Sequence, residues 1–300
     1  MLEVAASLLS GVARSDEPIG PKTTYRVGGR AALFAEIDSE HALARVCDAV
    51  AHSGIAVLVL GRGSNLLVAE SGFPGLCVTL AGSFAACRIE AGERLVVAGG
   101  GCDFPVLARR SAAAGLAGME WAVGIPGSVG GAVRMNAGGH GADTSERLVD
   151  CRVVDLRSGA DGRRPAAQLA FGYRRSALGA GELVCDAAFR CAPGNPERSA
   201  ALISEIVAWR RAHQPGGRNA GSVFANPPGD SAGRLIEEAG LKGLRMGSAE
   251  VSHKHANFVQ ADPGGSADDV HRLVRTVQQV VAERCGVELE LELRLVGDFS

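Results

Sequence analysis

The sequence predicts a protein of mixed α and β structure that folds as two or three domains. Its 300 residues exceed what one ordinary hydrophobic core accommodates. Strand-helix-strand order marks the first part, and a hairpin signal follows from about residue 83. A Pro-Gly-Asn-Pro break then precedes a last third with longer helices. The predicted domains are therefore 1–82, 83–193 and 194–300.

Composition narrows the class of protein. A hydrophobic fraction of 46% with 21% charged residues is typical of soluble globular chains. The net charge of −2 gives no excess of positive charge that would attract nucleic acid or an anionic membrane. The N-terminus lacks a basic start followed by a long apolar core, so we expect a cytoplasmic protein. Eight cysteines without a C-x-x-C pair predict reduced, mostly buried thiols, with neither a metal site nor a disulfide framework.

The first domain is predicted from its caps and apolar runs. After a short lead-in that ends at Pro18, residues 31–37 read as a strand. Ser39 is expected to cap a helix that ends at Gly54. Residues 55–60 are continuously apolar, which is typical of a strand buried on both faces.

The segment Gly61–Asn65 follows that strand at its carboxyl end, the edge at which α/β sheets bind ligands. Its sequence, G-R-G-S-N, differs from the dinucleotide-binding fingerprint G-x-G-x-x-G. Because Leu66–Val68 then reads as another strand rather than a helix, a simple Rossmann turn is excluded. Gly75–Leu80 is predicted as one more strand that closes this domain.

The middle of the chain begins with a predicted hairpin, Cys87–Glu90 and Arg94–Ala98. Three glycines then precede Asp103, which is expected to cap a helix through Ala114. Strands are predicted near 148–156 and 182–190.

The last third contains three predicted helices and a strand. Asn195 and Pro196 start the first helix, with Leu202, Ile203, Ile206 and Val207 on its core face. The second covers Ala232–Ala239, and the third begins at a capping box of Ser266 and Asp269 and ends at Gly286. The final strand alternates strictly, with Val287, Leu289, Leu291, Leu293 and Leu295 pointing inward.

The most unusual stretch is Gly118–Gly141, which holds eight glycines. Such density is destabilising unless something requires bare backbone, and phosphate groups bound by main-chain N–H groups do so. Tight turns between strands are the alternative. Since the run is long, has no repeat period and carries Ser128 and Asn136 as possible donors, we favour a diphosphate-binding segment. We expect no helix to start after these glycines.

Several motifs, taken in order, carry a resemblance to one family. They are T-T-Y-R-V-G-G, G-R-G-S-N-L-L-V, G-I-P-G-S-V-G-G-A-V-R-M-N-A-G, F-G-Y-R-R-S, A-G-S-V-F-A-N-P, A-G-R-L-I-E-E-A-G-L-K-G and V-S-H-K-H-A-N-F-V. From about residue 20 to 297 the chain resembles the UDP-N-acetylenolpyruvoylglucosamine reductases, the UDP-N-acetylmuramate dehydrogenases of peptidoglycan synthesis. The resemblance implies an α+β fold of the vanillyl-alcohol-oxidase (PCMH) type. Two FAD-binding subdomains (1–82 and 83–193) and a substrate-binding domain (194–300) are expected.

The family's reaction, which the resemblance implies here, reduces an enolpyruvyl ether. NADPH reduces non-covalently bound FAD and leaves, and hydride then passes from flavin N5 to C3 of the enolpyruvyl group. Negative charge that develops at C2 spreads into the carboxylate, so a cation on the carboxylate and a proton donor to C2 are required.

Three matching positions supply that chemistry. Ser222 matches the family's proton donor, and Arg174 matches the arginine that holds the carboxylate, a task suited to a fork of N–H donors. Glu292 matches the second acid. From pattern alone each has an ordinary alternative: a turn hydroxyl, a surface arginine, and a glutamate on a solvated strand face. If the register slipped by two, Glu290 or Arg294 would take the place of Glu292.

The resemblance also implies binding residues. The cofactor set comprises Tyr25, Val27, Gly61, Gly63, Ser64, Asn65, Leu66, Gly124, Ile125, Pro126, Gly127, Ser128, Gly130, Gly131, Ala132, Asn136 and Gly138. The substrate set is Tyr173, Arg174, Asn226 and His253. Gly118–Gly141 would then form one wall of the FAD site and Gly61–Asn65 the opposing wall.

Departures from the family pattern are few. Ala225 stands where the family often has Lys, Leu291 where it usually has Pro, and Arg62 where it commonly has Gly. Tyr25 and Tyr173 are the only tyrosines, so the chain resembles the shorter subclass that lacks a tyrosine-bearing insertion. We expect a monomer whose partners are UDP-N-acetylglucosamine-enolpyruvate and NADPH. The alternatives are a non-catalytic binding protein and a flavin oxidase that uses O₂.

Overall fold

The structure is a computed structural model and describes residues 1–299. It divides into two compact units. The first contains Met1–Ser15, Leu33–Arg62 and Gly75–Arg210, and the second contains Asp16–Ala32, Gly63–Pro74 and the chain from Arg211 onward. The three-part division expected from the sequence stays a prediction.

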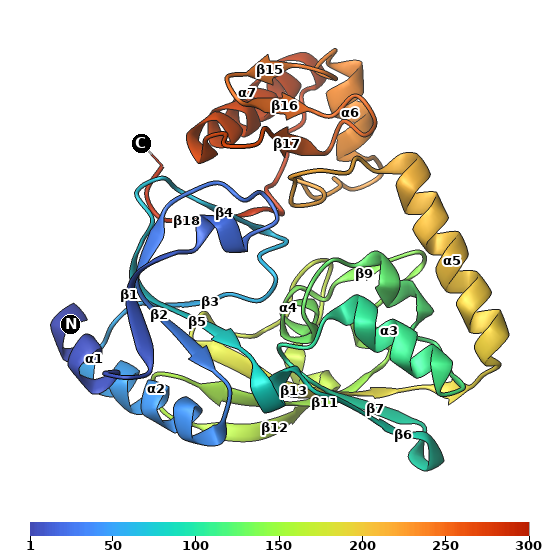
Figure 1. Ribbon diagram of the computed structural model, residues 1–300. Coiled ribbons are helices and arrows are strands. Elements are labelled where there is room, and N and C mark those ends of the chain that lie inside the picture. The colour runs from blue at the N-terminus through green and yellow to red at the C-terminus, as the bar shows by residue number, and fades with distance from the viewer. Residues whose placement is uncertain (300) are drawn as a thin grey trace. The chain divides into compact units, whose positions relative to one another are not determined.

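A four-stranded sheet has the order β1-β2-β5-β3, where β1 is Ala13–Pro18, β2 Arg30–Ile37, β5 Phe73–Leu80 and β3 Val57–Val59. The helix α2, Glu40–Ser53, joins β2 to β3 and packs against α1, Leu2–Leu8 (Figure 1). Its ends confirm the prediction: the Ser39 hydroxyl accepts from the Ala42 N–H, and Gly54 is left-handed at φ 64°.

In this region one strand was missed and one expectation was wrong. The N-terminal lead-in contains β1, which the polar sequence around Asp16 conceals. The apolar run 55–60 forms an edge strand, and all three β3 residues are half-buried rather than covered on both faces. It pairs in parallel only with β5, in the register Leu58 to Cys77.

A five-stranded antiparallel sheet forms the rest of the first unit's framework, in the order β12-β11-β13-β7-β6. These strands are β12 Asp161–Pro165, β11 Leu148–Asp155, β13 Glu182–Arg190, β7 Leu95–Gly99 and β6 Cys87–Glu90. The predicted hairpin and both predicted strands are confirmed, whereas β12 was missed. Helix α3, Phe104–Ala113, contacts β6 and β7, and α4, Val129–Met135, contacts β7 and β13.

Short elements complete this unit. They are the pairs β8 Leu116–Ala117 with β14 Ala192–Pro193 and β9 Gly138–Gly139 with β10 Ala142–Asp143.

Helix α5, Pro196–His213, begins as predicted, because the Asn195 side chain accepts from the Arg198 N–H at 2.8 Å. Leu202 is 44% exposed, contrary to expectation. The buried face instead follows Ser199, Ile203 and Ile206, one helical stripe to which Leu202 does not belong.

The second unit has a core of its own, packed around α6, Ala232–Glu238, and α7, Ala267–Cys285. A three-stranded antiparallel sheet, β15 Arg245–Met246, β16 Ala249–Val251 and β17 Val259–Ala261, contacts α7. The strand β4, Leu66–Val68, pairs in parallel with β18, Arg294–Val296.

The start of α7 differs from the predicted capping box. Ser266 caps the helix by accepting from the Asp268 N–H. Asp269 does not reach back to Ser266; its carboxylate accepts from the N–H and hydroxyl of Ser248, each at 2.7 Å. The Ser266 N–H donates to the Ser248 hydroxyl instead, so Ser248 takes the place of the expected partner.

The final alternating segment is also shorter than predicted as a strand. Leu289 and Leu293 are buried, but Leu295 is exposed and Val296 is buried in its place. The N–H groups of Glu292 and Leu293 both donate to the Val223 carbonyl. Because two consecutive residues share one carbonyl, the alternation of inward and outward side chains is interrupted. After Leu293 the inward-pointing side chain is therefore Val296 rather than Leu295.

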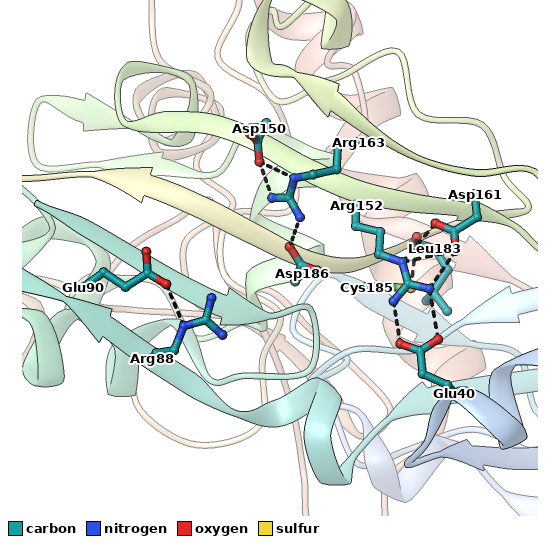
Figure 2. A network of polar contacts seen from close by, with 10 residues as sticks. All are labelled: Glu40, Arg88, Glu90, Asp150, Arg152, Asp161, Arg163, Leu183, Cys185 and Asp186. Carbon is teal, nitrogen blue, oxygen red and sulfur yellow. Dashed lines mark hydrogen bonds and ion pairs between the residues drawn. The ribbon is translucent and has the colours of Figure 1, made fainter. Parts of the chain in front are cut away.

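Charged side chains cover one face of the five-stranded sheet. Figure 2 shows Arg152 of β11 between Asp161 of β12 and Glu40 of α2, with Nη1 of Arg152 2.5 Å from Glu40 and Nη2 2.7 Å from Asp161. Arg163 lies between Asp150 and Asp186 in the same view. Hydrogen bonds to Arg152 lower the pKa of both Glu40 and Asp161. The network ties α2 to the sheet.

No helix among residues 1–299 combines the length and apolar character that a membrane span requires. Within the same residues, no three His, Cys, Asp or Glu side chains gather as metal ligands.

Candidate cofactor and active site

A pocket of about 140 Å³ lies within the first unit, after the ends of β3 and β5. It brings together three glycine-rich segments that are distant in sequence, represented by Gly61, Gly100 and Gly130. The pocket's complete lining is Val59, Leu60, Gly61, Arg62, Thr79, Leu80, Gly100, Gly101, Ser128, Gly130, Gly131, Arg134, Leu178, Glu182, Leu183 and Val184. Its volume is below the several hundred Å³ that hold a whole cofactor, so it accommodates one part of a larger ligand.

The glycines of this pocket serve two purposes. A Cβ atom on Gly100 would lie 1.8 Å from the Val184 carbonyl oxygen, so bare backbone is required there by packing alone. A Cβ on Gly131, in contrast, would meet only the Ser128 hydroxyl, at 3.4 Å. Gly131 is therefore free of a packing requirement and lines the pocket, while its N–H donates to the Ser128 hydroxyl.

A helix does start within the glycine stretch, which corrects the prediction that none follows. Ser128 caps α4 by accepting from the Gly131 N–H at 3.3 Å, and its side chain is buried. The sequence concealed this helix because two glycines lie in its first turn, where helix propensity is poor. The buried side chains of Ala132 and Val133 hold the helix in place.

Two arginines give the pocket a positive side. Arg62 pairs through Nε with Asp103 at 3.0 Å, and Arg134 donates to the Gly179 carbonyl at 2.8 Å. The one acidic side chain of the lining, Glu182, is paired with Arg164 and accepts from the Gly179 N–H, and the Arg164 contact lowers its pKa. Sequence reasoning did not single out Arg134, which lies inside the glycine-rich motif, or Glu182, which begins a predicted strand.

These features fit a bound diphosphate. Main-chain groups at glycines approach an anion closely, and arginines form charge-assisted hydrogen bonds to phosphate oxygens. Of the predicted cofactor residues, the structure brings Gly61, Ser128, Gly130 and Gly131 to the pocket. Gly124, Ile125, Pro126, Gly127, Ala132, Asn136 and Gly138 belong to the same stretch but do not line it.

Arg174 lies in a strained turn of the first unit. The N–H of Arg175 donates to the Gly172 carbonyl at 3.2 Å, and Arg174 has φ 54°, a conformation that normally selects Gly or Asn at this position. Nη2 of Arg174 donates to the Gly138 carbonyl at 2.9 Å. The exposed Tyr173 ring lies 5.2 Å from the guanidinium carbon. Retaining a strained arginine is expected where the side chain has a specific task.

Ser222 and Glu292 lie on neighbouring segments of the second unit. The Glu292 N–H donates to the carbonyl of Val223, the residue after Ser222, at 2.9 Å, and Ala225 N–H donates to the Glu290 carbonyl at 2.9 Å. Ser222 and Glu292 are both half-buried, whereas Glu290 is exposed. Asn65, a predicted cofactor residue, supports this pairing by donating its side-chain amide to the Glu292 carbonyl at 3.1 Å.

The other predicted residues of the second unit differ in exposure. Tyr25 and Val27 are buried in its core, and desolvation raises the pKa of the Tyr25 hydroxyl. Gly63 is left-handed and packs against Thr23, so its glycine is structural. Asn226 accepts from the Ala232 N–H at 3.1 Å, and His253 is exposed beside Glu250, with 3.3 Å between Nε2 and a carboxylate oxygen. Ser64 and Leu66 are half-buried.

Comparison with known proteins gives two matching family models. Residues 31–160 match an FAD-binding domain, and residues 213–296 match the C-terminal domain of UDP-N-acetylenolpyruvoylglucosamine reductase. The reductase of Rubrobacter xylanophilus is 44% identical over 95% of this chain and 96% of its own. The chain belongs to the UDP-N-acetylenolpyruvoylglucosamine reductase family.

Two further similarities agree with this assignment. A reductase of Symbiobacterium thermophilum is 40% identical over 96% of this chain and 93% of its own. The crystal structure of the Thermus caldophilus reductase superimposes with a TM-score of 0.82 at 36% identity, over 93% of this chain and 97% of that one. The expected α+β FAD-binding fold is therefore confirmed, and the protein is an oxidoreductase with an FAD-binding domain.

Proposed function

We propose that this protein reduces UDP-N-acetylglucosamine-enolpyruvate to UDP-N-acetylmuramate in peptidoglycan synthesis, with FAD as cofactor and NADPH as reductant. The observation that carries the proposal is the retention of Arg174, Ser222 and Glu292 in a chain of this family whose glycine-walled pocket fits a diphosphate. We propose a cytoplasmic monomer.

The diphosphate of the cofactor would lie against the bare backbone of Gly61, Gly130 and Gly131, with the charge-assisted hydrogen bonds supplied by Arg62 and Arg134. When bound, FAD supplies the hydride for C3 of the enolpyruvyl group after its own reduction by NADPH. Tyr25, Val27, Gly63, Ser64, Asn65 and Leu66 of the second unit, with Gly124, Ile125, Pro126, Gly127, Ser128, Ala132 and Gly138, complete the proposed set.

Arg174 would bind the enolpyruvyl carboxylate. Its guanidinium presents donors in a fixed fork, and the Gly138 carbonyl and the Tyr173 ring limit its rotamers. Charge that develops on the carboxylate during reduction is stabilised by a cation that is already oriented, which lowers the barrier without reorganisation.

Ser222 would deliver the proton to C2. An isolated serine is a weak acid, so the transfer requires a group that stabilises or relays the resulting alkoxide. Glu292, the second acid of the proposal, belongs to the segment paired with the Ser222 loop. Tyr173, Asn226 and His253 are proposed to contact the UDP-sugar.

An anaerobic titration tests the proposal. The purified protein is examined for flavin absorbance, NADPH is added, and the enolpyruvyl substrate follows. Bleaching by NADPH with recovery only on addition of substrate is the expected result. Absence of flavin would contradict an enzyme of this kind, and rapid recovery in air without substrate would favour an oxidase.

A further inference from the structure

Asn136 connects the end of α4 to the turn that carries Arg174. Its side chain is only 4% exposed, and its backbone is left-handed at φ 40°. Nδ2 donates to an Asp143 carboxylate oxygen at 3.1 Å and to the Gly172 carbonyl at 3.2 Å. Oδ1 accepts from the Ser145 N–H at 3.0 Å. Both amide hydrogens and the amide oxygen are thus used within the protein.

The orientation of this amide follows from its partners. Asp143 and the Gly172 carbonyl only accept hydrogen bonds, whereas the Ser145 N–H only donates. If the amide were flipped, its oxygen would face the oxygens of Asp143 and Gly172, and its NH₂ group would face the Ser145 N–H. Asp143 is itself fixed, since its other carboxylate oxygen accepts from the Ser145 N–H at 3.0 Å and hydroxyl at 2.6 Å.

The same hairpin holds both ends of the Arg174 turn. Asp143 pairs with Gly138 across β9 and β10, and the Gly138 carbonyl accepts from the Arg174 guanidinium. On the backbone side, the Gly172 carbonyl accepts from both Asn136 and the Arg175 N–H. Asn136 therefore fixes the Gly172 carbonyl, which closes the strained turn, and the Gly138 carbonyl fixes the Arg174 side chain.

A role in ending α4 does not explain these contacts. A left-handed residue after a helix is satisfied by glycine, which has no side chain. The Asn136 amide instead reaches Gly172, 36 positions further along the chain. Both amide hydrogens are already donated, so a direct hydrogen bond from this amide to a cofactor would require breaking one of these part-buried bonds.

We propose that Asn136 is a positioning residue that holds the Arg174 turn in the geometry for binding the substrate carboxylate, and that it does not act on the cofactor. This inference rests on the proposed function of Arg174. A guanidinium displaced by about 1 Å costs up to about 100-fold in rate when it must meet a defined group.

The test uses Asn136→Gly in the flavin-loaded protein. Glycine adopts φ 40° without strain and keeps the end of α4, but removes the side-chain contacts. We expect normal flavin content, an unchanged rate of flavin reduction by NADPH, and reoxidation by substrate slowed about 10- to 100-fold. Loss of flavin from the variant, or wild-type reoxidation, would overturn the inference.

A double-mutant cycle with Arg174→Gln separates positioning from a general structural effect. If Asn136 acts through Arg174, adding Asn136→Gly to the Arg174→Gln protein slows reoxidation little further. Multiplicative effects of the two changes would contradict the inference. Wild-type protein run in parallel distinguishes the failures: if substrate does not reoxidise wild-type flavin, the proposed function and this inference both fall. If it reoxidises wild type and Asn136→Gly equally, only the inference falls.

Discussion

The main-chain N–H of Glu292 donates to the carbonyl of Val223, and this bond at 2.9 Å connects the segment of one proposed acid to the loop of the other. Ser222 precedes Val223 directly. The alternating glutamates of the C-terminal segment are thereby distinguished: Glu292 is half-buried at this junction, whereas Glu288 and Glu290 are exposed. The sequence alone left open which glutamate of this segment is the second acid. Mutation of Glu292 and of Glu290 can now test that choice.

Glu292→Gln should slow substrate-dependent flavin reoxidation about 10²- to 10⁴-fold, the usual contribution of a general acid or base. The amide keeps the size of the side chain but cannot release a proton. Glu290→Gln is the matched control and should react as wild type, because only the Glu290 carbonyl takes part in the pairing with Ala225. Stopped-flow absorbance of the flavin measures both. Equal defects in the two variants would contradict the assignment.

Ser222→Ala should still be reduced by NADPH at the wild-type rate, and its reoxidation by substrate should fall about 10²- to 10⁴-fold. The hydroxyl is required only when C2 is protonated. Ser231→Ala serves as the control: it removes the hydroxyl that caps α6 in the same unit and should lower stability by about 1 kcal/mol without slowing reoxidation. Unimpaired reoxidation of Ser222→Ala would exclude Ser222 as the acid.

Elements with caps and a clear apolar period were predictable from the sequence. Ser39 and Gly54 bound α2 as expected, and the hairpin around Ala91–Glu93 forms. Helix α4 was missed because its glycines disfavour a helix locally, and tertiary contacts of Ala132 and Val133 override that preference. Leu295 was misassigned because one shared carbonyl, at Val223, changes the period.

The candidate site was predictable to a similar degree. The segments around Gly61 and Gly130, which glycine density singled out, line one pocket, and their role in binding a cofactor stays a prediction. No local pattern distinguishes a glycine needed by packing, such as Gly100, from one that a ligand could use, such as Gly131. The partners of Asn136 were equally hidden, since they come from long-range contacts.

Gly131→Ala should fold normally and bind FAD about 5- to 150-fold more weakly, the equivalent of 1–3 kcal/mol of overpacking in the pocket. Its new methyl group meets only the Ser128 hydroxyl, at an ordinary contact distance of 3.4 Å. Gly100→Ala is the contrasting variant: its methyl group would collide with the Val184 carbonyl, so we expect loss of folded protein. Fluorescence titration of apoprotein with FAD, together with thermal unfolding, measures both. Wild-type FAD affinity in Gly131→Ala would argue against this pocket as the cofactor site.

Arg152→Gln should lower the free energy of unfolding at pH 7 by about 1 kcal/mol, because it removes the cation shared by Glu40 and Asp161. Arg152 lowers the folded-state pKa of both carboxyls below their ordinary values of 4.5 and 3.8. Their stabilisation is therefore complete above about pH 5 and is lost as the pH falls through those lowered values. Chemical denaturation between pH 3 and 7 should show a weaker acid dependence in the variant, and 1 M NaCl should reduce the difference. If both proteins lost stability in parallel over this range, the network would not be the source of the acid sensitivity.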